Sequence, residues 1–314
     1  MLFLGAGRVE HGQLDGAILA MMAFAALAAF EAVWSLPTAF QYLSRTREAS
    51  RRLTEIIEQL PAVTFPSRSA SPANHDIVFE GVTFRYDRQT PDVLTNFTLR
   101  IDQGERVAVM GATGAGKSTL VNLLVRFWDV DAGHILVGGQ DIRTLSEARL
   151  RRGMAVVSQQ SHLFNATLRD NLRLAGPDAD DDRLWEALGK ARLDRFVSAL
   201  PRGLDTWIGE AGHHLSGGEA RRMAIAQAVL QNAPVWLLDE PTEGLDSANE
   251  QQLMKTLYAL TAQRTMLLIT HRPVALDQMD RIAILDQGRI VEAGRHHALL
   301  ANGKHYPHLW MNRL

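Results

Sequence analysis

Hydrophobic residues follow distinct patterns along the chain, and the first of them is a long apolar stretch. Between residues 16 and 44 the only charged side chain is Glu31. A helix needs about 20 apolar residues to cross a bilayer core of about 30 Å. The stretch therefore predicts one membrane-spanning helix over residues 16–40. Arginines follow it from Arg45 to Arg52, and this positive flank predicts that the rest of the chain lies in the cytoplasm.

Strand patterns appear only later in the chain. Residues 77–86 and 94–101 alternate between apolar and polar, which is typical of an antiparallel sheet with one buried face. Later strands are continuous apolar runs, as expected for parallel strands buried on both faces. These runs cover residues 107–110, 154–157, 235–238, 266–269 and 282–285. Helical segments separate them, so the patterns predict an α/β fold with a mostly parallel sheet.

A boundary separates the apolar stretch from the strands. Three prolines and three serines fall within residues 61–76, a composition that resists regular structure. We therefore expect three parts. Residues 1–60 are the remnant of a transmembrane domain whose helix continues into the cytoplasm, residues 61–76 are a linker, and residues 77–314 are the α/β domain.

Composition excludes several kinds of chemistry. The 314 residues carry 33 Lys+Arg against 35 Asp+Glu and include no cysteine. A net charge of −2 does not support nonspecific binding of nucleic acid, which needs a surface that neutralises phosphates. Without cysteine there are no disulfides, catalytic thiolates, zinc fingers or iron–sulfur clusters.

A phosphate-binding loop follows the apolar run 107–110. The residues Gly111-Ala-Thr-Gly-Ala-Gly-Lys-Ser118 fit G-x-x-x-x-G-K-[ST] between a predicted strand and a predicted helix. Glycines let successive backbone N–H groups converge on phosphate, and the following helix adds the positive end of its dipole. Lys117 would reach the β- and γ-phosphates of ATP, and Ser118 would ligate Mg²⁺. The expected nucleotide contacts are Gly111, Thr113, Gly114, Ala115, Gly116, Lys117, Ser118 and Thr119.

An acidic pair ends the apolar run 235–238. Asp239 stands at the end of a predicted strand, where it can hold Mg²⁺ directly or through water. Glu240 is then placed to orient or deprotonate the attacking water. Such a pair is also common at helix starts, so alone it decides little. Together with the phosphate-binding loop it predicts an ATP-hydrolysing site that uses ATP and Mg²⁺.

The segment Leu215-Ser-Gly-Gly-Glu219 opens an apolar helix, whose first N–H groups can bind an anion. With the two preceding motifs it resembles the signature of ATP-binding cassette (ABC) transporters, with Glu219 where glutamine is more usual. The resemblance implies that Ser216, Gly217 and Gly218 bind the γ-phosphate of ATP held by a second subunit. It also implies a nucleotide-binding domain with a RecA-like parallel-sheet core, an antiparallel β subdomain and a helical subdomain.

Other positions match the same family in order along the chain. The resemblance implies that Tyr86 stacks on adenine, although a tyrosine here also suits a strand core. It implies that Gln159 contacts Mg²⁺ and senses the membrane domain; Gln160 beside it offers an alternative register. Asp246 matches the D-loop near the nucleotide, and His271 matches the switch histidine that contacts the γ-phosphate.

The loop Thr206–Gly212 resembles one that precedes the signature in exporters. Within exporters the motifs resemble CydC-type subunits, each one half of a heterodimeric exporter of cysteine and glutathione that is linked to cytochrome bd assembly and haem. The segments that carry this resemblance are Val63–Pro66, His162–Asn171, Gly209–Arg222 and Pro241–Asp246. It implies a CydD-type partner subunit, a thiol or other small-molecule substrate, and a place in the bacterial inner membrane. Such subunits have six membrane helices and only the last is expected here, so we expect Met1 to be a fragment start, a truncated gene or an internal initiation.

Alternative functions stay open at this point. A half-subunit that exports a lipid or a drug would carry the same cassette, because the substrate contacts lie in the missing helices. Whether the subunits pair as a homodimer or a heterodimer is open for the same reason. A soluble ABC ATPase of DNA repair or translation is a further alternative, which the predicted span and the exporter-type loop oppose.

Overall fold

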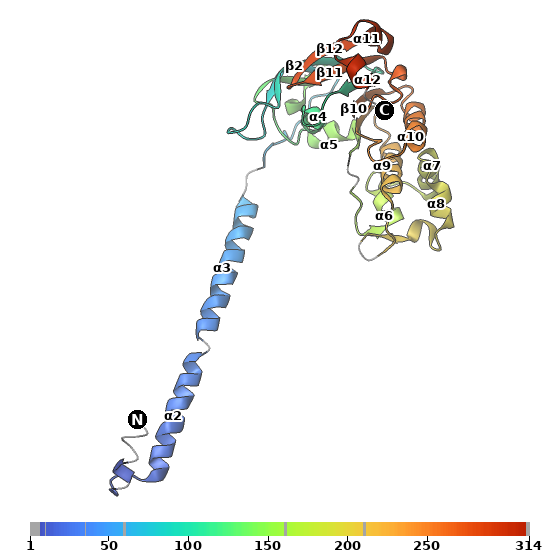
Figure 1. Cartoon of the computed structure of the whole chain (residues 1–314). Coiled ribbons are helices and arrows are strands. Elements are labelled where there is room, and N and C mark those ends of the chain that lie inside the picture. Colours follow the sequence, from blue (N-terminus) through green and yellow to red (C-terminus); the bar gives the residue numbers. More distant parts are fainter. Residues whose placement is uncertain are drawn as a thin grey trace. The chain divides into compact units, whose positions relative to one another are not determined.

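The computed structural model describes residues 7–9, 11–34, 36–58, 61–159, 162–209 and 212–311. The chain divides into two compact units, Met1–Pro61 and Ala62–Leu314 (Figure 1).

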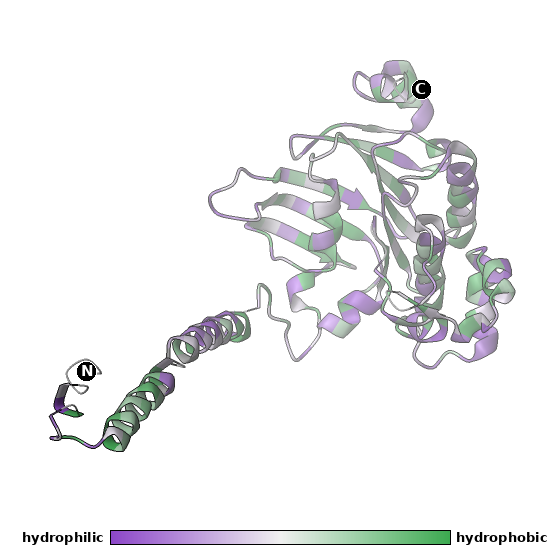
Figure 2. Cartoon of the chain, turned by 60° about the horizontal axis from the view of Figure 1, so that its bottom comes forward, coloured by the Kyte–Doolittle hydropathy of each residue, from purple (hydrophilic) through white to green (hydrophobic). Residues whose placement is uncertain are grey.

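The first unit contains the long helices α2 (Gly16–Trp34) and α3 (Leu36–Glu58). α2 is built almost entirely from apolar residues, whereas α3 mixes apolar and charged positions (Figure 2). On α3, Arg51 forms ion pairs with Glu48 and Glu55, which lie one turn away on the same face.

The sequence predicts a membrane-spanning helix over residues 16–40, and α2 and α3 cover the described part of this range. None of the helices in the described ranges combines the length and the apolar character that a membrane crossing needs.

The second unit contains all the strands described in the chain. They are β1 (Ile77–Phe84), β2 (Leu94–Ile101), β3 (Arg106–Met110), β4 (Ala132–Val137), β5 (Gln140–Asp141), β6 (Met154–Val157), β7 (Ala166–Thr167), β8 (Trp207–Ile208), β9 (Val235–Asp239), β10 (Thr265–Thr270), β11 (Arg281–Asp286) and β12 (Arg289–Gly294). Its α-helices are α4 (Lys117–Leu124), α5 (Glu147–Arg152), α6 (Leu168–Arg173), α7 (Asp181–Lys190), α8 (Asp194–Ala199), α9 (Gly217–Gln231), α10 (Ser247–Leu260), α11 (His296–Asn302) and α12 (Tyr306–Met311).

These strands form the two kinds of sheet that the sequence predicts. One sheet has the order β2-β1-β4-β5 and is antiparallel. The larger sheet has the order β12-β11-β3-β10-β9-β6, and all its pairs are parallel except that of β12 at the edge. The prediction of an α/β fold with an antiparallel part is confirmed. β7 and β8 form a separate two-stranded pair.

Both faces of the parallel sheet are buried, which explains the continuous apolar runs. In β3, Val107 and Val109 belong to a hydrophobic core shared with α4 and the antiparallel sheet. Ala108 and Met110 belong to a second core, shared with α9, α10 and the helices α6–α8. Because successive side chains of a strand point to opposite faces, each strand needs apolar residues at every position.

The helices α6 to α9 form a group of their own. α9 contacts α6 and α7, and α7 contacts α8; Figure 1 shows the four gathered on one side of the second unit. α9 also packs on β6, so this helical group is fixed against the edge of the parallel sheet.

Candidate active site

The order of the parallel strands brings the predicted catalytic residues together. β10 lies between β3 and β9, with Thr270 opposite Met110 and Ile269 opposite Asp239. The residues that follow these strands, which include Gly111, Glu240 and His271, therefore start from one edge of the sheet. Ligand sites of parallel α/β sheets lie at this carboxyl edge.

The phosphate-binding loop connects β3 to α4 and depends on two of its glycines for its shape. Gly116 has φ of 96°, and a Cβ there would lie 2.9 Å from the carbonyl oxygen of Val93. A Cβ at Gly111 would lie 2.3 Å from the carbonyl oxygen of Leu285. Backbone atoms cannot give way like the end of a side chain, so both positions require glycine.

Lys117 is the first residue of α4 and is only 6% exposed. Its Nζ donates to the carbonyl oxygens of Gly111 at 2.9 Å and Ala112 at 2.8 Å, and lies 3.8 Å from Glu240 Oε1. Burial lowers the pKa of the ammonium, and the charges of Glu240 and Asp239 oppose this effect. The loop thus curls around its own lysine, with the cation beside two carboxylates.

Ser118 and Asp239 form the oxygen-rich part of the site. Ser118 Oγ donates to Asp239 Oδ1 at 3.1 Å. Burial raises the pKa of Asp239, and the hydrogen bond from Ser118 and the charge of Lys117 do not offset this effect. A hydroxyl and a carboxylate are hard oxygen ligands of the kind that Mg²⁺ prefers, so these residues fit the predicted metal. Among the described residues, no group of three or more His, Asp or Glu side chains is arranged to hold a metal, which is consistent with a site that takes its remaining ligands from nucleotide and water.

Glu240 follows β9 in a strained conformation. Its φ is 48°, in the left-handed region that residues other than glycine rarely adopt, and its N–H donates to the carbonyl oxygen of Ile269 at 2.8 Å. The turn directs the carboxylate toward His271, whose Nδ1 lies 2.9 Å from Glu240 Oε1. The same oxygen of Glu240, Oε1, thus lies near both Lys117 Nζ and His271 Nδ1.

Gln159 follows β6 and lines a cavity of about 820 Å³ together with Ser118 and Asp239. The sequence-predicted metal ligands therefore share one cavity. Gln160, the alternative register, lies outside the described residues. Two residues that the motifs did not assign contact Gln159: its Nε2 donates to Glu243 Oε2 at 2.5 Å, and Arg221 Nη2 donates to its carbonyl oxygen at 3.1 Å.

The predicted adenine platform lies beside the phosphate-binding helix. Tyr86 is 43% exposed, and its hydroxyl is 3.1 Å from the hydroxyl of Thr119. Its ring meets Phe84 and Trp128 edge to face, with centroids 4.9 and 5.7 Å apart. The tyrosine side chain thus remains partly accessible near the loop. Within that loop Thr113 and Gly114 are exposed, and Ala115 is half-buried.

The signature residues lie elsewhere on the domain. Ser216 caps α9, and its hydroxyl donates to Glu219 Oε2 at 2.8 Å while the N–H of Glu219 donates back to it. Ser216 and Gly218 line a cavity of about 330 Å³, none of whose lining residues belongs to the cavity of Ser118 and Gln159. Gly217 and Asp246 are exposed, and Asp246 caps α10. The chain therefore does not bring the signature to its own phosphate-binding loop.

Comparison with known proteins agrees with this geometry. Residues 94–243 match the family model described as ABC transporter. The chain carries an ABC transporter ATP-binding domain. The matched range contains the phosphate-binding loop, the signature and the acidic pair, whereas Tyr86, Asp246 and His271 lie outside it. The family match and the exporter relatives imply ATPase activity, as the sequence predicts.

Transport proteins match the chain over most of its length. The chain is 42% identical over 308 residues to the glutathione/L-cysteine transport system ATP-binding/permease protein CydC of Escherichia coli, covering 98% of this chain and 53% of that protein. It is 36% identical over 310 residues to the ATP-dependent lipid A-core flippase of Chromobacterium violaceum, with coverage of 98% and 53%. The structure of a bacterial Atm1-family ABC exporter with ATP bound matches with a TM-score of 0.78 and 32% identity, covering 96% of this chain and 53% of that one. The chain thus spans about half the length of each of these relatives.

Proposed function

We propose that this chain is the ATP-hydrolysing part of an ABC exporter half-subunit of CydC type. The observation that carries the proposal is the convergence of Lys117, Glu240 and His271 at one sheet edge, beside the contact between Ser118 and Asp239. A buried lysine in a glycine loop, a strained acid and a histidine in contact with it suit phosphoryl transfer to water.

In this proposal Lys117 exchanges the carbonyl oxygens of its own loop for the β- and γ-phosphates of ATP. The carboxylate of Glu240 accepts a proton from the attacking water, and His271 holds that carboxylate and contacts the γ-phosphate. Tyr86 stacks on the adenine ring. Bound Mg²⁺ neutralises phosphate charge, and Ser118, Asp239 and Gln159 are the residues that would hold it.

The signature serves a second nucleotide. Ser216, Gly217 and Gly218 open α9, where free N–H groups and the helix dipole favour an anion. Their cavity is separate from that of the phosphate-binding loop, so they bind the γ-phosphate of ATP held by another subunit, with Asp246 beside them. Two subunits then enclose two nucleotides, and hydrolysis separates them.

The transported substrate is proposed from the relatives. The name of the Escherichia coli relative, a protein of a glutathione/L-cysteine transport system, supports glutathione or cysteine as the substrate. Our proposal adds export across the bacterial inner membrane and a CydD-type partner. Several relatives are lipid A-core flippases, which supports lipid transport as the second candidate. ATP-dependent uptake by inverted vesicles that contain the full-length subunit and its partner distinguishes them: labelled glutathione or cysteine accumulates in the first case, and only labelled lipid moves in the second.

The hydrolytic role is tested at Glu240. Glu240→Gln keeps the size of the side chain but cannot accept the proton, so we expect ATP binding to persist while hydrolysis falls about 10²–10⁴-fold. Lys117→Ala should weaken nucleotide binding itself, because it removes the cation that meets the phosphates. Equilibrium binding of a fluorescent ATP and single-turnover hydrolysis measure the two effects. Wild-type hydrolysis by Glu240→Gln, paired with an inactive partner site, would contradict the assignment.

A further inference from the structure

The amide of Gln159 is held by a carboxylate that the motifs do not assign. Its Nε2 donates to Glu243 Oε2 at 2.5 Å. An ionised carboxylate only accepts hydrogen bonds, whereas an amide has one donor end and one acceptor end. The bond to Glu243 therefore selects one orientation of the amide, with the NH₂ group toward Glu243 and Oε1 left for another partner.

Gln159 belongs to the cavity that contains the proposed metal ligands. Gln159 lines that cavity with Ser118 and Asp239, whereas Glu243 does not line it. Mg²⁺ accepts oxygen ligands and is repelled by N–H donors, so the metal site requires Oε1 and not Nε2. We propose that Glu243, which does not line the cavity, is a positioning residue: it orients the amide of Gln159 so that the carbonyl oxygen Oε1 can bind Mg²⁺. The inference rests on the proposed ATPase function and adds a residue to its metal site.

Arg221 holds the main chains of both partners in place. Only 9% of this residue is exposed, and its Nη1 donates to the carbonyl oxygen of Glu243 at 2.5 Å while Nη2 donates to that of Gln159 at 3.1 Å. The N–H of Glu243 also donates to the carbonyl oxygen of Glu240 at 3.1 Å. The contact between Glu243 and Gln159 is thus built on a fixed backbone, in the way that outer residues commonly orient metal ligands.

Other roles for Glu243 predict a different change in metal affinity when its carboxylate is removed. If Glu243 instead withheld Gln159 from the metal, its removal would free the amide and tighten metal binding. If the contact only stabilised the loops, its removal would lower stability without changing metal affinity. Weaker metal binding therefore indicates positioning, tighter binding indicates withholding, and unchanged binding indicates a purely structural contact.

The experiment measures the affinity of the chain for Mn²⁺, which serves as a probe of the Mg²⁺ site. The full chain is titrated with Mn²⁺ in the presence of a non-hydrolysable ATP analogue, and free Mn²⁺ is followed by electron paramagnetic resonance. We expect Glu243→Ala to weaken Mn²⁺ binding about 10-fold, since loss of an outer-shell partner typically costs 10–100-fold. Glu243→Gln, whose side-chain carbonyl can still accept from Gln159, should lose less. Binding of the analogue in EDTA should stay unchanged.

A double-mutant cycle separates positioning from general damage. In a Gln159→Ala background, Glu243→Ala should cause no further loss of Mn²⁺ affinity, because the amide that it orients is gone. Glu186→Ala, an exposed carboxylate on α7 that pairs with Lys190, is the matched control and should bind Mn²⁺ like the wild type.

Failure of the positioning role can be distinguished from failure of the proposed function. If the wild-type chain binds the analogue and Mn²⁺ but Glu243→Ala and Glu243→Gln bind Mn²⁺ as tightly or more tightly, the positioning role is overturned. If the wild-type chain does not bind the analogue at all, the proposed function itself fails.

Discussion

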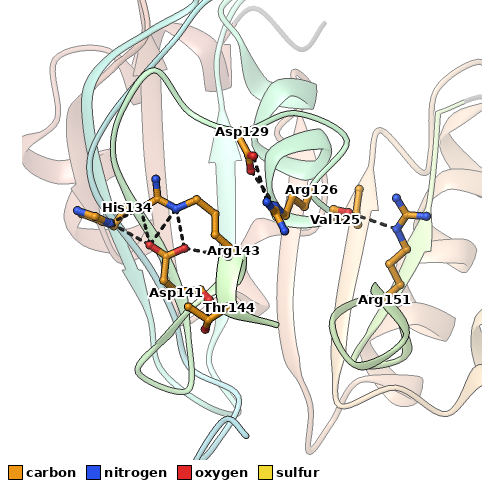
Figure 3. A network of polar contacts seen from close by, with 8 residues as sticks. All are labelled: Val125, Arg126, Asp129, His134, Asp141, Arg143, Thr144 and Arg151. Atoms are coloured by element: carbon orange, nitrogen blue, oxygen red, sulfur yellow. Dashed lines mark hydrogen bonds and ion pairs between the residues drawn. The ribbon is translucent and has the colours of Figure 1, made fainter. Parts of the chain in front are cut away.

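Asp141 illustrates how a single carboxylate can stabilise the antiparallel sheet. It ends β5 and accepts from Arg143 Nη2 at 2.6 Å, and His134 Nδ1 lies 2.9 Å away (Figure 3). Burial raises its pKa, but the hydrogen bonds from Arg143 and His134 outweigh burial and lower the pKa from 3.8 to about 2. The folded state therefore favours the ionised carboxylate more than the unfolded chain does.

We expect Asp141→Asn to destabilise the second unit at neutral pH. Arg143 and His134 are partly exposed, so solvent screening reduces the effect of this shift to about 1–2 kcal/mol. Because the folded pKa is the lower one, this stability is fully present above the unfolded pKa near 4 and is lost as the pH falls toward 2. Urea unfolding of both proteins at a series of pH values should show a difference in unfolding free energy that is largest at pH 7 and shrinks below pH 4. A constant difference across this range would show that the charge is not its cause.

Individual site residues differ in how far the sequence could identify them. Asp239, Glu240 and His271 stand at the end of apolar runs or just after them, and the ends of parallel strands meet at one edge, so the sequence could place them on the same edge of the sheet. The strand order β3-β10-β9 that makes them neighbours is not visible in the runs. The contact between Gln159 and Glu243 joins residues 84 positions apart through two loops, and no periodicity reports such a pair.

At the scale of elements, hydrophobic periodicity predicted long strands well and short or irregular elements poorly. β1 and β2 alternate because one face is buried, and β3, β9 and β10 are continuous because both are. β7 and β8 contain two residues each, too few for any period.

The last helix of the domain is capped from a strand. Glu292 in β12 accepts the N–H groups of Lys304 at 2.6 Å, His305 at 3.2 Å and Tyr306 at 2.9 Å, at the start of α12. Burial raises the pKa of Glu292, but these backbone donors outweigh it and leave the pKa below its usual value. One carboxylate thus satisfies several N–H groups that a helix start leaves without partners.

Glu292→Ala should loosen α12 from the sheet. Loss of a capping side chain typically costs about 1–2 kcal/mol, so we expect faster hydrogen exchange at residues 304–306 and earlier proteolysis after α11. Glu292→Gln keeps one acceptor and should show a smaller effect. ATP binding should not change in either variant, since the capped residues lie outside the candidate site. Exchange at wild-type rates in Glu292→Ala would mean that the packing of Tyr306, which is fully buried, holds the helix by itself.

At the scale of the whole domain, the residues that the proposed function assigns to nucleotide lie in two separate cavities. Ser118 and Asp239 line one cavity, and Ser216 lines another with no shared lining residue. In the proposed function, a complete site therefore takes its signature from a second subunit. Because a homodimer is symmetric, its two sites would be identical, whereas a heterodimer can have two different ones.

We therefore expect Ser216→Arg to act on only one site when this subunit is paired with a different one. The arginine would fill the place of the γ-phosphate at the site whose phosphate-binding loop lies on the partner, while Lys117 and Glu240 keep their own nucleotide. Single-turnover hydrolysis by the full-length complex should then lose one of two phases, and the double variant Ser216→Arg, Glu240→Gln should lose both. Titration of the purified subunits against each other should give maximal ATPase activity at equal amounts. Full activity from this subunit alone, with both phases abolished by Ser216→Arg and no gain from the partner, would instead establish a homodimer.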